Sequence, residues 1–432
     1  MIKQCSKLIA LTLLAQSLAA CSSGEDVSTE LEQQPVELTL YAQMPLSDEQ
    51  WQTLMLDPLR KKYPHITLHI VNRQGSAGPH MPDLIASGDT PDLYTVASVL
   101  LGEYAQLGVT EDFTPYAKRL GVDVNRFKPQ VMEALRALAP ADEVYALPYN
   151  LNFNAIYYNR DIFDLFGVDY PVDGMTWKEV MDKGREVSRH EGGRTYRGLD
   201  PNHVFQLAYQ RSVLPVDAAT KRASVNTPVW QDVFRLAQEI YSIPNNEPAN
   251  FNDVNSGGHN RFMKDRNVAM YAGVNLAPLL KEPTETGLNW DVVQFPSTAD
   301  KPNVYSTVDA HVIGMTSTTK HKEDAARVIE LFTSNEVQKI AVRQIANFSP
   351  LSDSVFQEQF GADVHYLKGK NFSGVFRSVN AETPAFSVYN VDAERIIRTH
   401  YRNFLRGDYD VNTALRTAEE EVNQRIEALS QQ

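Results

Sequence analysis

Amide and phenol side chains gather in one short stretch of the chain, EVYALPYNLNFNAIYYNRDIFDLFGVD, at residues 143–169. Tyr149, Asn150 and Asn152 follow directly after a Leu-Pro step, and more Asn and Tyr residues come soon after them. A buried amide or phenol that lacks a hydrogen-bond partner costs about 1–3 kcal/mol, so these residue types are a poor choice for a core. We therefore predict that this stretch lies at a wet cleft and binds a polar ligand there.

Motifs for enzymatic catalysis are absent from the sequence. The GSAG segment at Gly75 is not G-x-S-x-G, the HEGGR segment at His190 lacks the second His of H-E-x-x-H, and neither a P-loop nor C-x-x-C occurs. We expect no catalytic residues, no metal site and no cofactor. A carbohydrate-active hydrolase remains an alternative, because the separation of its paired carboxylates, roughly 5–9.5 Å, leaves no trace in sequence.

The N-terminus is typical of an exported protein. Lys3 and Lys7 precede an apolar run from Leu8 to Ala20, which is too short for the ~20 residues that span a bilayer. This pattern predicts a signal peptide at residues 1–20. The run ends in Leu-Ala-Ala-Cys, which looks like a bacterial lipobox, so we expect Cys21 to carry a diacylglycerol and palmitate anchor. A plain signal peptide followed by a chance cysteine is the alternative.

Composition limits how the exported part can fold and what it can bind. The sequence has two cysteines, and loss of Cys5 with the signal peptide leaves no disulfide partner for Cys21, so a large core must hold the fold. Residues 21–35 are polar and acidic and predict a linker between lipid and body. The formal net charge of -13 argues against nucleic acid as a partner and disfavours polyanionic ligands. The acidity is equally explained by a need for solubility.

Strand and helix patterns alternate in the first part of the chain. Residues 36–41 and 65–71 alternate apolar and polar side chains as strands do, and a third strand is expected to start near Asp92. Ser47 and Gln50 form a capping box that starts a helix, which Pro58 should bend or end early. A strand-helix-strand succession predicts parallel pairing.

Later segments continue this pattern. Residues 155–159 predict a strand whose Tyr157 and Tyr158 face opposite sides, one of them in the core. A second capping box, Thr176 with Glu179, starts a helix that Gly192 and Gly193 should stop. Short buried strands are predicted at 267–275 and 311–317. Two helices are predicted over 323–345, the second capped by Thr333 and Glu336, and a terminal helix is predicted over 412–432. Trp177, Trp230 and Trp290 are expected in the core.

Six blocks, taken together and in this order, resemble one family. They are IASGDTPDLYTV, the stretch at 143–169, MTWKEVMDKGREVSR, RFMKDRNVAMYAGVN, KHKEDAARVIELFTSNEVQ and GDYDVNTALRTAEEEVNQRI. Each block is weak alone, but their collinear order is similar to that of the bacterial extracellular solute-binding proteins (family 1) that serve ABC importers, in particular the sugar-binding lipoproteins.

This resemblance implies an α/β, two-lobed, periplasmic-binding-protein-like fold (type II). Each lobe would be a mainly parallel sheet flanked by helices, and a hinge would join the lobes. The expected boundaries are 36–147 plus 304–347 for lobe one and 148–303 plus 348–432 for lobe two, with the Leu-Pro step at the first crossing. The implied function is non-enzymatic capture of a sugar or oligosaccharide by a lipid-anchored monomer outside the cytoplasm, for delivery to an ABC permease. A binding protein that serves a membrane sensor is the alternative.

Candidate ligand-binding residues follow from the polar stretch and from the family's order. Amides both donate and accept hydrogen bonds, which suits sugar hydroxyls, and aromatic faces stack on the C–H side of a pyranose. Packing or turn formation is the competing explanation for several of them, and Asn275 stands where the family often has Trp. The candidates are Tyr41, Asp89, Asp92, Tyr149, Asn150, Asn152, Asn275, Asp309, Phe386 and Tyr389.

Overall fold

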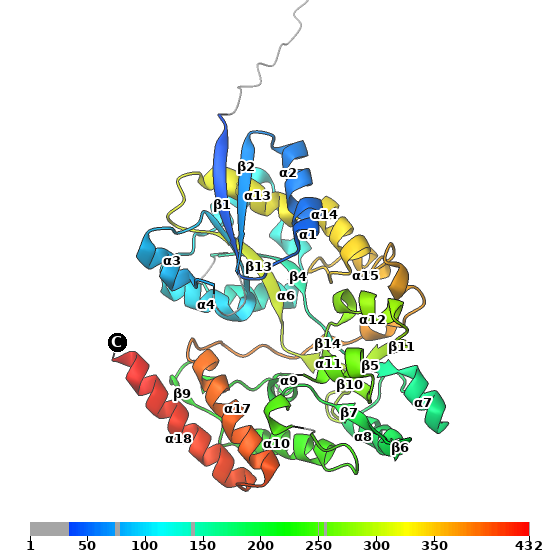
Figure 1. The fold of residues 1–432 in the computed structure, drawn as a ribbon. Helices are drawn as coiled ribbons and strands as arrows, with labels where there is room; N and C mark the ends of the chain where they lie inside the picture. The colour runs from blue at the N-terminus through cyan, green and yellow to red at the C-terminus, as the bar shows by residue number, and fades with distance from the viewer. Residues whose placement is uncertain (1–33, 74–77, 140–142, 249, 255–256, 432) are drawn as a thin grey trace, which may run out of the picture. The chain divides into compact units, whose positions relative to one another are not determined.

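The computed structural model describes residues 34–73, 78–139, 143–248, 250–254 and 257–431 (Figure 1). Pro35–Gln432 forms one compact unit, separate from Met1–Gln34. The expected signal peptide, Cys21 and nearly all of the expected linker lie outside the described residues. Within the described ranges, every helix is too short or too polar to cross a membrane.

The first of two five-stranded sheets has the order β2-β1-β3-β13-β4. Its strands are β1 (Val36–Ala42), β2 (Ile66–Asn72), β3 (Leu93–Ala97), β4 (Leu147–Leu151) and β13 (Ala310–Met315). β1 pairs in parallel with β2 and β3, which confirms the strand-helix-strand prediction. β13 comes from far along the chain and pairs antiparallel with β3 and β4.

The second sheet has the order β11-β5-β10-β7-β6. Its strands are β5 (Asn154–Asn159), β6 (Arg189–Glu191), β7 (Arg194–Asp200), β10 (Val268–Val274) and β11 (Trp290–Gln294). Of its pairings, β10 with β7 is parallel, while β5 runs antiparallel to both of its neighbours. Both sheets are therefore mixed rather than mainly parallel, because an alternating pattern identifies a strand but not its direction. Short ladders join β8 (Val216–Asp217) to β9 (Arg222–Ala223) and β12 (Val304–Ser306) to β14 (Val379–Asn380).

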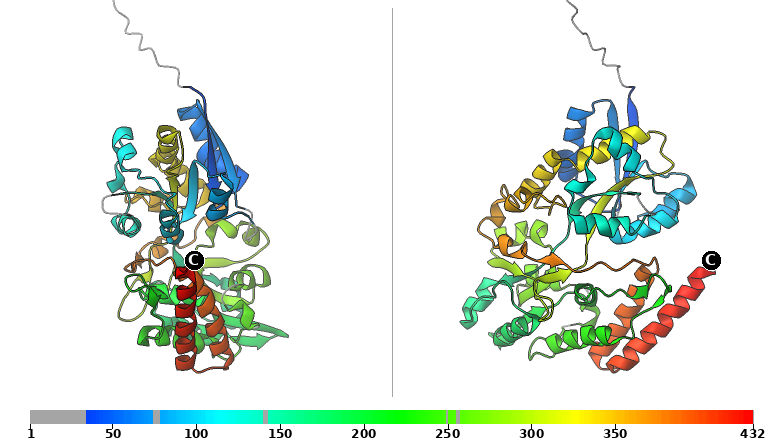
Figure 2. Two further views of the ribbon diagram at one scale, coloured as in Figure 1. Left: turned by 90° about the vertical axis from the view of Figure 1, so that its left-hand side faces the viewer. Right: turned by 180° about the vertical axis from the view of Figure 1, so that it is seen from behind.

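Helices cover both sheets, which confirms the two-lobed α/β prediction. They are α1 (Asp48–Trp51), α2 (Asp57–Lys62), α3 (Met81–Ser87), α4 (Ser98–Gln106), α5 (Thr114–Leu120), α6 (Pro129–Arg136), α7 (Arg160–Phe166), α8 (Trp177–Val187), α9 (Val204–Gln210), α10 (Pro228–Tyr241), α11 (Gly258–Asn260), α12 (Lys281–Glu285), α13 (Lys322–Phe332), α14 (Asn335–Ile340), α15 (Val355–Glu358), α16 (Phe372–Val375), α17 (Asn390–Arg406) and α18 (Val411–Ser430). α13 packs on β13 and α8 on β7, while α17 and α18 lie side by side (Figure 2).

Both predicted capping boxes are present, at Ser47 with Gln50 and at Thr176 with Glu179. Pro58 was predicted to bend or end the first helix early, and the early end is wrong. The π-helical turn η1 (Gln52–Leu56) precedes α2, and Pro58 then lies in the first turn of α2, where its missing N–H is tolerated. The helical run therefore continues to Lys62.

The stop predicted at Gly192 and Gly193 is also wrong, because α8 already ends at Val187. Both glycines have positive φ and form the two-residue turn between β6 and β7, with Glu191 opposite Arg194. Such a turn requires φ > 0, which glycine adopts without strain.

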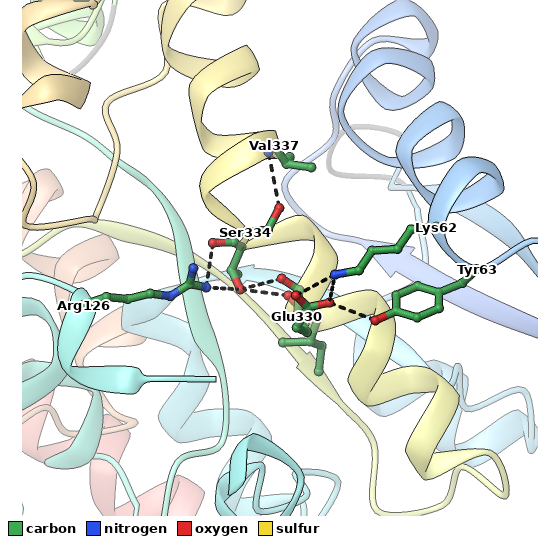
Figure 3. A network of polar contacts seen from close by, with 8 residues as sticks. Lys62, Tyr63, Arg126, Glu330, Ser334 and Val337 are labelled. Atoms are coloured by element: carbon green, nitrogen blue, oxygen red, sulfur yellow. Dashed lines mark hydrogen bonds and ion pairs between the residues drawn. The ribbon is translucent and has the colours of Figure 1, made fainter. Parts of the chain in front are cut away.

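The cap of α14 lies one residue later than predicted. The Ser334 hydroxyl accepts the Val337 N–H at 3.3 Å, whereas the Thr333 hydroxyl donates back to the Ile329 carbonyl at 2.9 Å (Figure 3). Arg126 donates to the Thr333 carbonyl at 2.8 Å, which ties this corner to the chain ahead of α6. Thr333 therefore ends α13, and Ser334 begins α14.

We expect Ser334→Ala to lower the free energy of unfolding by about 1 kcal/mol, because an N–H at the start of α14 loses its acceptor. Urea denaturation of the chain and this variant measures the change. Ser334→Asp keeps an acceptor at the cap and should remain within a few tenths of a kcal/mol of the original. Equal losses in both variants would show that the hydroxyl does not act as a cap.

The three tryptophans predicted in the core are buried there, and so are both Tyr157 and Tyr158. Tyr157 packs on the Trp290 ring, and its hydroxyl accepts the Leu276 N–H at 3.0 Å. Tyr158 packs on Phe163 from the other side of the strand. A polar tip with its own partner lets a phenol sit in the core, so residue type alone did not separate core from cleft.

The chain passes between the sheets at three places. Residues 152–153 separate β4 from β5, residues 307–309 precede β13, and residues 346–351 follow the last helix on the first sheet. The Leu-Pro step had been expected at the first crossing, but it lies inside β4. The Leu151 N–H donates to the Phe348 carbonyl at 2.7 Å, so the first and third crossings lie against each other.

Phenylalanines pack around these two crossings. The ring of Phe153 meets those of Phe348 and Phe376 edge to face, at centroid distances of 5.7 and 5.5 Å, and Phe348 stacks on Phe376 at 4.7 Å. The Lys128 ammonium lies 3.9 Å from the centroid of Phe348, and burial lowers the pKa of this lysine to about 8. The crossings are thus anchored by aromatic packing from several segments.

Candidate functional site

A cavity of about 380 Å³ lies where the two sheets' connecting segments meet. From the side of the first sheet it is lined by the start of α4, by α6 and by Asn152. From the other side come Asn154 of β5, α9 and α17, and two extended segments at 305–309 and 383–386 complete the wall. Concave sites of this size, with mixed apolar and polar lining, are typical of small-molecule binding.

Two helices present their polar side chains to the cavity through helical spacing. On α9 and its cap, His203, Gln206 and Tyr209 recur every three residues. On α17, Glu394 and Arg398 are four residues apart. Residues three or four apart share one helix face, so each helix directs a polar set to the same place.

The side chains of Tyr209, Glu394 and Arg398 form a chain of contacts along one wall. The Tyr209 hydroxyl donates to Glu394, and Arg398 lies 3.4 Å from the other carboxylate oxygen. Burial raises the pKa of Glu394, while Tyr209 and Arg398 oppose this change. Burial, together with the Glu394 charge, raises the pKa of Tyr209, so the phenol stays protonated.

On the facing wall, the first and second crossings contribute Asn152 and Asp309, and β13 contributes His311. The Asn152 amide donates to the Asp309 carboxylate at 3.0 Å, and the Asn152 backbone N–H donates to the Asp309 carbonyl at 2.9 Å. Burial lowers the pKa of His311, and the Asp309 charge opposes this shift. An acidic, an amide and an imidazole group are thereby held together at the cavity.

Two cavity groups lack partners among the described residues, namely Asn154 Nδ2 and His203 Nδ1. Asn154 is 4 % exposed, and its carbonyl oxygen already accepts from Gln206 at 3.3 Å. An orphaned buried donor costs about 1–3 kcal/mol, and ligands commonly satisfy such groups. With the rings of Tyr305 and Phe386 nearby, the lining suits a ligand that carries both hydroxyls and apolar C–H faces.

Burial and the nearby Arg398 charge lower the pKa of His203 to about 3, so the folded chain holds this imidazole neutral. Unfolding exposes it, and its pKa returns toward 6.5. Its contribution to stability is therefore complete above about pH 6.5 and declines as the pH falls toward 3. In the original chain the free energy of unfolding falls as the pH is lowered. We expect His203→Phe to reduce the slope of this fall by up to about 1.4 kcal/mol per pH unit.

Urea denaturation at several pH values measures this slope in both chains. Their difference at pH 8, where both side chains are neutral, reports the change in packing alone. Parallel stability curves from pH 8 to pH 4 would contradict the buried-imidazole account.

Three of the ten candidate residues line the cavity, namely Asn152, Asp309 and Phe386. They come from segments more than seventy residues apart in the chain, which the fold brings together. Ligand binding by each remains a prediction.

Two candidates of the first sheet, Tyr41 of β1 and Asp92 at the start of β3, have partners within the protein. The Tyr41 hydroxyl donates to the Pro79 carbonyl at 2.6 Å. Asp92 accepts the Thr39 N–H at 2.9 Å and the Thr319 hydroxyl at 2.6 Å, which fixes the start of β3. Asp89 is exposed in the turn after α3. None of these three side chains lines the described cavity.

The other four candidates also lie off the cavity lining. Tyr149, expected at the cleft floor, is 2 % exposed because β4 directs its ring into the first core. Asn150 lies behind His311, and Asn275 accepts from the Tyr157 hydroxyl at 3.3 Å and the Ala277 N–H at 2.9 Å. Tyr389 packs with a small apolar group beside α17.

Sequence reasoning missed the cavity residues on α9 and α17 and at His311. The helical spacing of Gln206 with Tyr209, and of Glu394 with Arg398, was the available signal. Nothing in the sequence alone indicated that these two helices face one cavity. Among the described His, Cys, Asp and Glu residues, no group of three is placed to hold a metal ion.

Curated relatives are distant. Two Brucella abortus proteins and one from Brucella suis, each named as a binding protein, are 22% identical to this chain over 272 residues. The match covers 58% of this chain and 62% of each relative, so the chain matches less than two thirds of their length.

Solved structures match over nearly the whole chain. An ABC substrate-binding protein from Listeria monocytogenes, in complex with cycloalternan, has a TM-score of 0.76 at 18% identity and covers 91% of this chain and 99% of its own. A sugar-binding protein from Xanthomonas citri gives 0.71 at 16%, covering 91% and 98%. A solute-binding protein from Thermotoga lettingae, bound with alpha-D-tagatose, gives 0.70 at 17%, covering 90% and 99%. These likenesses establish a shared fold.

The family model described as bacterial extracellular solute-binding protein matches residues 42–339, which is more than half of the chain. The match includes the second sheet, every strand of the first sheet except β1, and the α9 part of the cavity. With the two-lobed fold and the cavity between connecting segments, this match shows that the chain belongs to the bacterial extracellular solute-binding protein family.

Proposed function

We propose that the chain captures a sugar or oligosaccharide in the cavity between its two sheets and delivers it, unchanged, to an ABC importer. The observation that carries this proposal is the cavity lining. Amide, carboxylate and hydroxyl groups from both sides converge there beside Tyr209, Tyr305 and Phe386. Hydroxyls of a sugar match such donors and acceptors, and its C–H faces match the rings.

Charge and neighbouring folds support this ligand class. With His203 and His311 neutral, the cavity carries Asp309, Glu394 and one balancing cation, Arg398. A polyanion has no site of matching charge there. The Listeria and Thermotoga proteins with this fold were solved with cycloalternan and alpha-D-tagatose.

A thermal-shift screen tests the ligand class. The panel contains D-tagatose, D-mannitol, maltotriose, mannotriose and cycloalternan, with amino acids as the matched small polar controls. A ligand present at a hundredfold excess over its Kd stabilises the folded state by about 2.7 kcal/mol. Stabilisation by an amino acid and by none of the carbohydrates would contradict the proposal. Mass spectrometry of the recovered sugar should show it intact, and cleavage would favour a hydrolase.

We further propose that the lobes are discontinuous, as in the expected scheme of 36–147 plus 304–347 for lobe one and 148–303 plus 348–432 for lobe two. Because β4 belongs to the first sheet, we move the joints to the three crossings at 152–153, 307–309 and 346–351, and we propose that ligand closes the lobes about them. A ligand that contacts both sides favours the closed population. Small-angle scattering with a saturating sugar from the screen should show a smaller radius of gyration. An unchanged radius at saturation would reject closure.

Export and anchoring complete the proposed role. Processing before Cys21, with acylation of its thiol, would tether a monomeric binding protein outside the cytoplasm, near permease subunits. We expect Cys21→Ser to release the mature chain from the membrane fraction, because a serine hydroxyl does not replace the thiol as lipid acceptor. Fractionation with immunoblotting measures this change. A Cys21→Ser chain that remains fully membrane-bound would show that something other than this lipid holds it.

A further inference from the structure

His311 of β13 lines the cavity and has an amide nitrogen beside each of its ring nitrogens. Nδ1 lies 3.3 Å from Asn150 Nδ2, and Nε2 lies 3.4 Å from Asn152 Nδ2. A neutral imidazole has one donor and one acceptor nitrogen, whereas an amide nitrogen only donates. Only one of the two contacts can therefore be a hydrogen bond.

The orientation of each amide is fixed by a second partner. The Asn150 oxygen accepts the Phe348 backbone N–H at 3.1 Å, and because that N–H can only donate, the NH2 end of Asn150 must face His311. The Asn152 NH2 lies 3.0 Å from an Asp309 carboxylate oxygen, which can only accept when ionised. Neither amide can be reversed without losing its second bond.

The need for partners then places the imidazole proton. Asn150 is 7 % exposed, and among the described residues His311 Nδ1 is the one acceptor for its NH2 group. Asn152 already donates to Asp309. A proton on Nδ1 would leave the buried Asn150 NH2 group without an acceptor, at a cost of about 1–3 kcal/mol. A proton on Nε2 instead faces the Asn152 NH2 group at 3.4 Å, and that group keeps its bond to Asp309.

We propose that Asn150 positions His311 as the Nε2–H tautomer, so that the cavity holds an N–H donor next to the Asp309 carboxylate. One ligand hydroxyl can accept a hydrogen bond from the His311 Nε2–H and donate one to the Asp309 carboxylate. The identity of that hydroxyl rests on the proposed function, but the tautomer does not. Asn150 is thus a positioning residue that acts on the ligand through His311.

The surroundings of His311 favour its neutral form. A second proton would have to sit on Nδ1, against the Asn150 NH2 group. Asp309 favours the cation, but burial outweighs it and lowers the pKa of His311. Tyr149 packs at 6.0 Å from the ring.

The remaining titratable groups are those of the opposite wall. They are His203, Tyr209, Glu394 and Arg398, and Tyr305 of the extended segment adds a phenol whose pKa is raised by burial. Glu394 and Arg398 face each other at 3.4 Å, so their charges largely balance at His311.

Histidine side-chain NMR tests this inference without any ligand. The full chain is labelled with ¹⁵N-histidine, and two-bond ¹H–¹⁵N correlations at pH 7.5 report which ring nitrogen carries the proton. The His311 signals are assigned by their loss in His311→Gln. We expect an unprotonated Nδ1 and a protonated Nε2. The reverse pattern, or a doubly protonated ring, would overturn the inference.

Asn150→Asp is the decisive variant, because the carboxylate keeps the acceptor for Phe348 N–H but replaces the NH2 donor with an acceptor. We expect the His311 Nδ1 signal to move into the protonated range. Asn275→Asp adds the same charge at an amide bonded to Tyr157 and Ala277, and it should leave the His311 pattern unchanged. An unprotonated Nδ1 in Asn150→Asp would also overturn the inference.

The two proposals fail separately. An Nε2–H tautomer in a chain that no carbohydrate of the panel stabilises would sink the proposed function and leave the positioning role of Asn150 intact. An Nδ1–H tautomer in a chain that binds a sugar would do the opposite.

Discussion

Tyr149→Ala should lower the free energy of unfolding of the ligand-free chain by about 3–5 kcal/mol, the range for truncating a large core aromatic. The ring is buried against Phe332 at a centroid distance of 4.7 Å and near His311 at 6.0 Å. A Tyr149 that bound ligand, as the sequence analysis expected, would instead lose ligand affinity on truncation and leave stability nearly unchanged. Urea denaturation without ligand decides between these two outcomes.

Tyr149→Phe is the matched control. The Tyr149 hydroxyl is buried toward Thr95 without a well-formed hydrogen bond, and burial keeps the phenol protonated. Its removal keeps the packing and should change stability by less than about 1 kcal/mol. A large loss in Tyr149→Phe would mean that the hydroxyl has a partner. A stable Tyr149→Ala chain that binds sugar weakly would restore the cleft-floor assignment.

Asp309→Asn should weaken binding of the most stabilising sugar of the panel by roughly 10- to 150-fold. Hydrogen bonds to charged groups contribute about 1.5–3 kcal/mol, and each 1.4 kcal/mol changes Kd tenfold. The asparagine oxygen can still accept from Asn152, so the crossing keeps its contact while the cavity loses the carboxylate. Isothermal titration calorimetry measures the change.

Asp300→Asn provides the control for net charge. Asp300 is exposed, lies in the loop between β11 and β12 and does not line the cavity. It should bind the sugar as the original chain does. Equal affinity for all three chains would remove Asp309 from the binding site, and equal weakening in both variants would attribute the effect to overall charge.

Much of the fold was predictable because its signals are local. Alternation in residues 36–41 and the capping boxes at Ser47 and Thr176 depend on neighbours within a few residues. The order of the six sequence blocks then indicated the family and its two lobes. Errors arose where two local signals competed, as at Thr333 and Ser334, or where a π-helical turn accommodated Pro58.

The cavity depended on longer-range information. Asn152 was predicted from the polar stretch and Asp309 from the family's order, and both line the cavity. The α9 and α17 residues were missed, because their polar helix faces look like any solvated face until the other sheet is in place. Conversely, Tyr149 and Asn150 were predicted as ligand contacts. Strand β4 directs the Tyr149 ring into the core and places Asn150 behind His311.

The sequence by itself determined most of the element types and the acidic charge, since these follow from composition and short-range periodicity. The order of its six blocks carried the resemblance to solute-binding proteins, and the export signal at residues 1–20 stays a prediction. Only the tertiary structure decided the antiparallel pairings of β5 and β13, the membership of β13 in the first sheet and the side chains that share the cavity. The physical reason is that an amide or phenol can be buried in a core where its polar atoms have hydrogen-bond partners, or can lie in a ligand site. Which of the two it occupies depends on partners far away in the chain, such as Phe348 for Asn150.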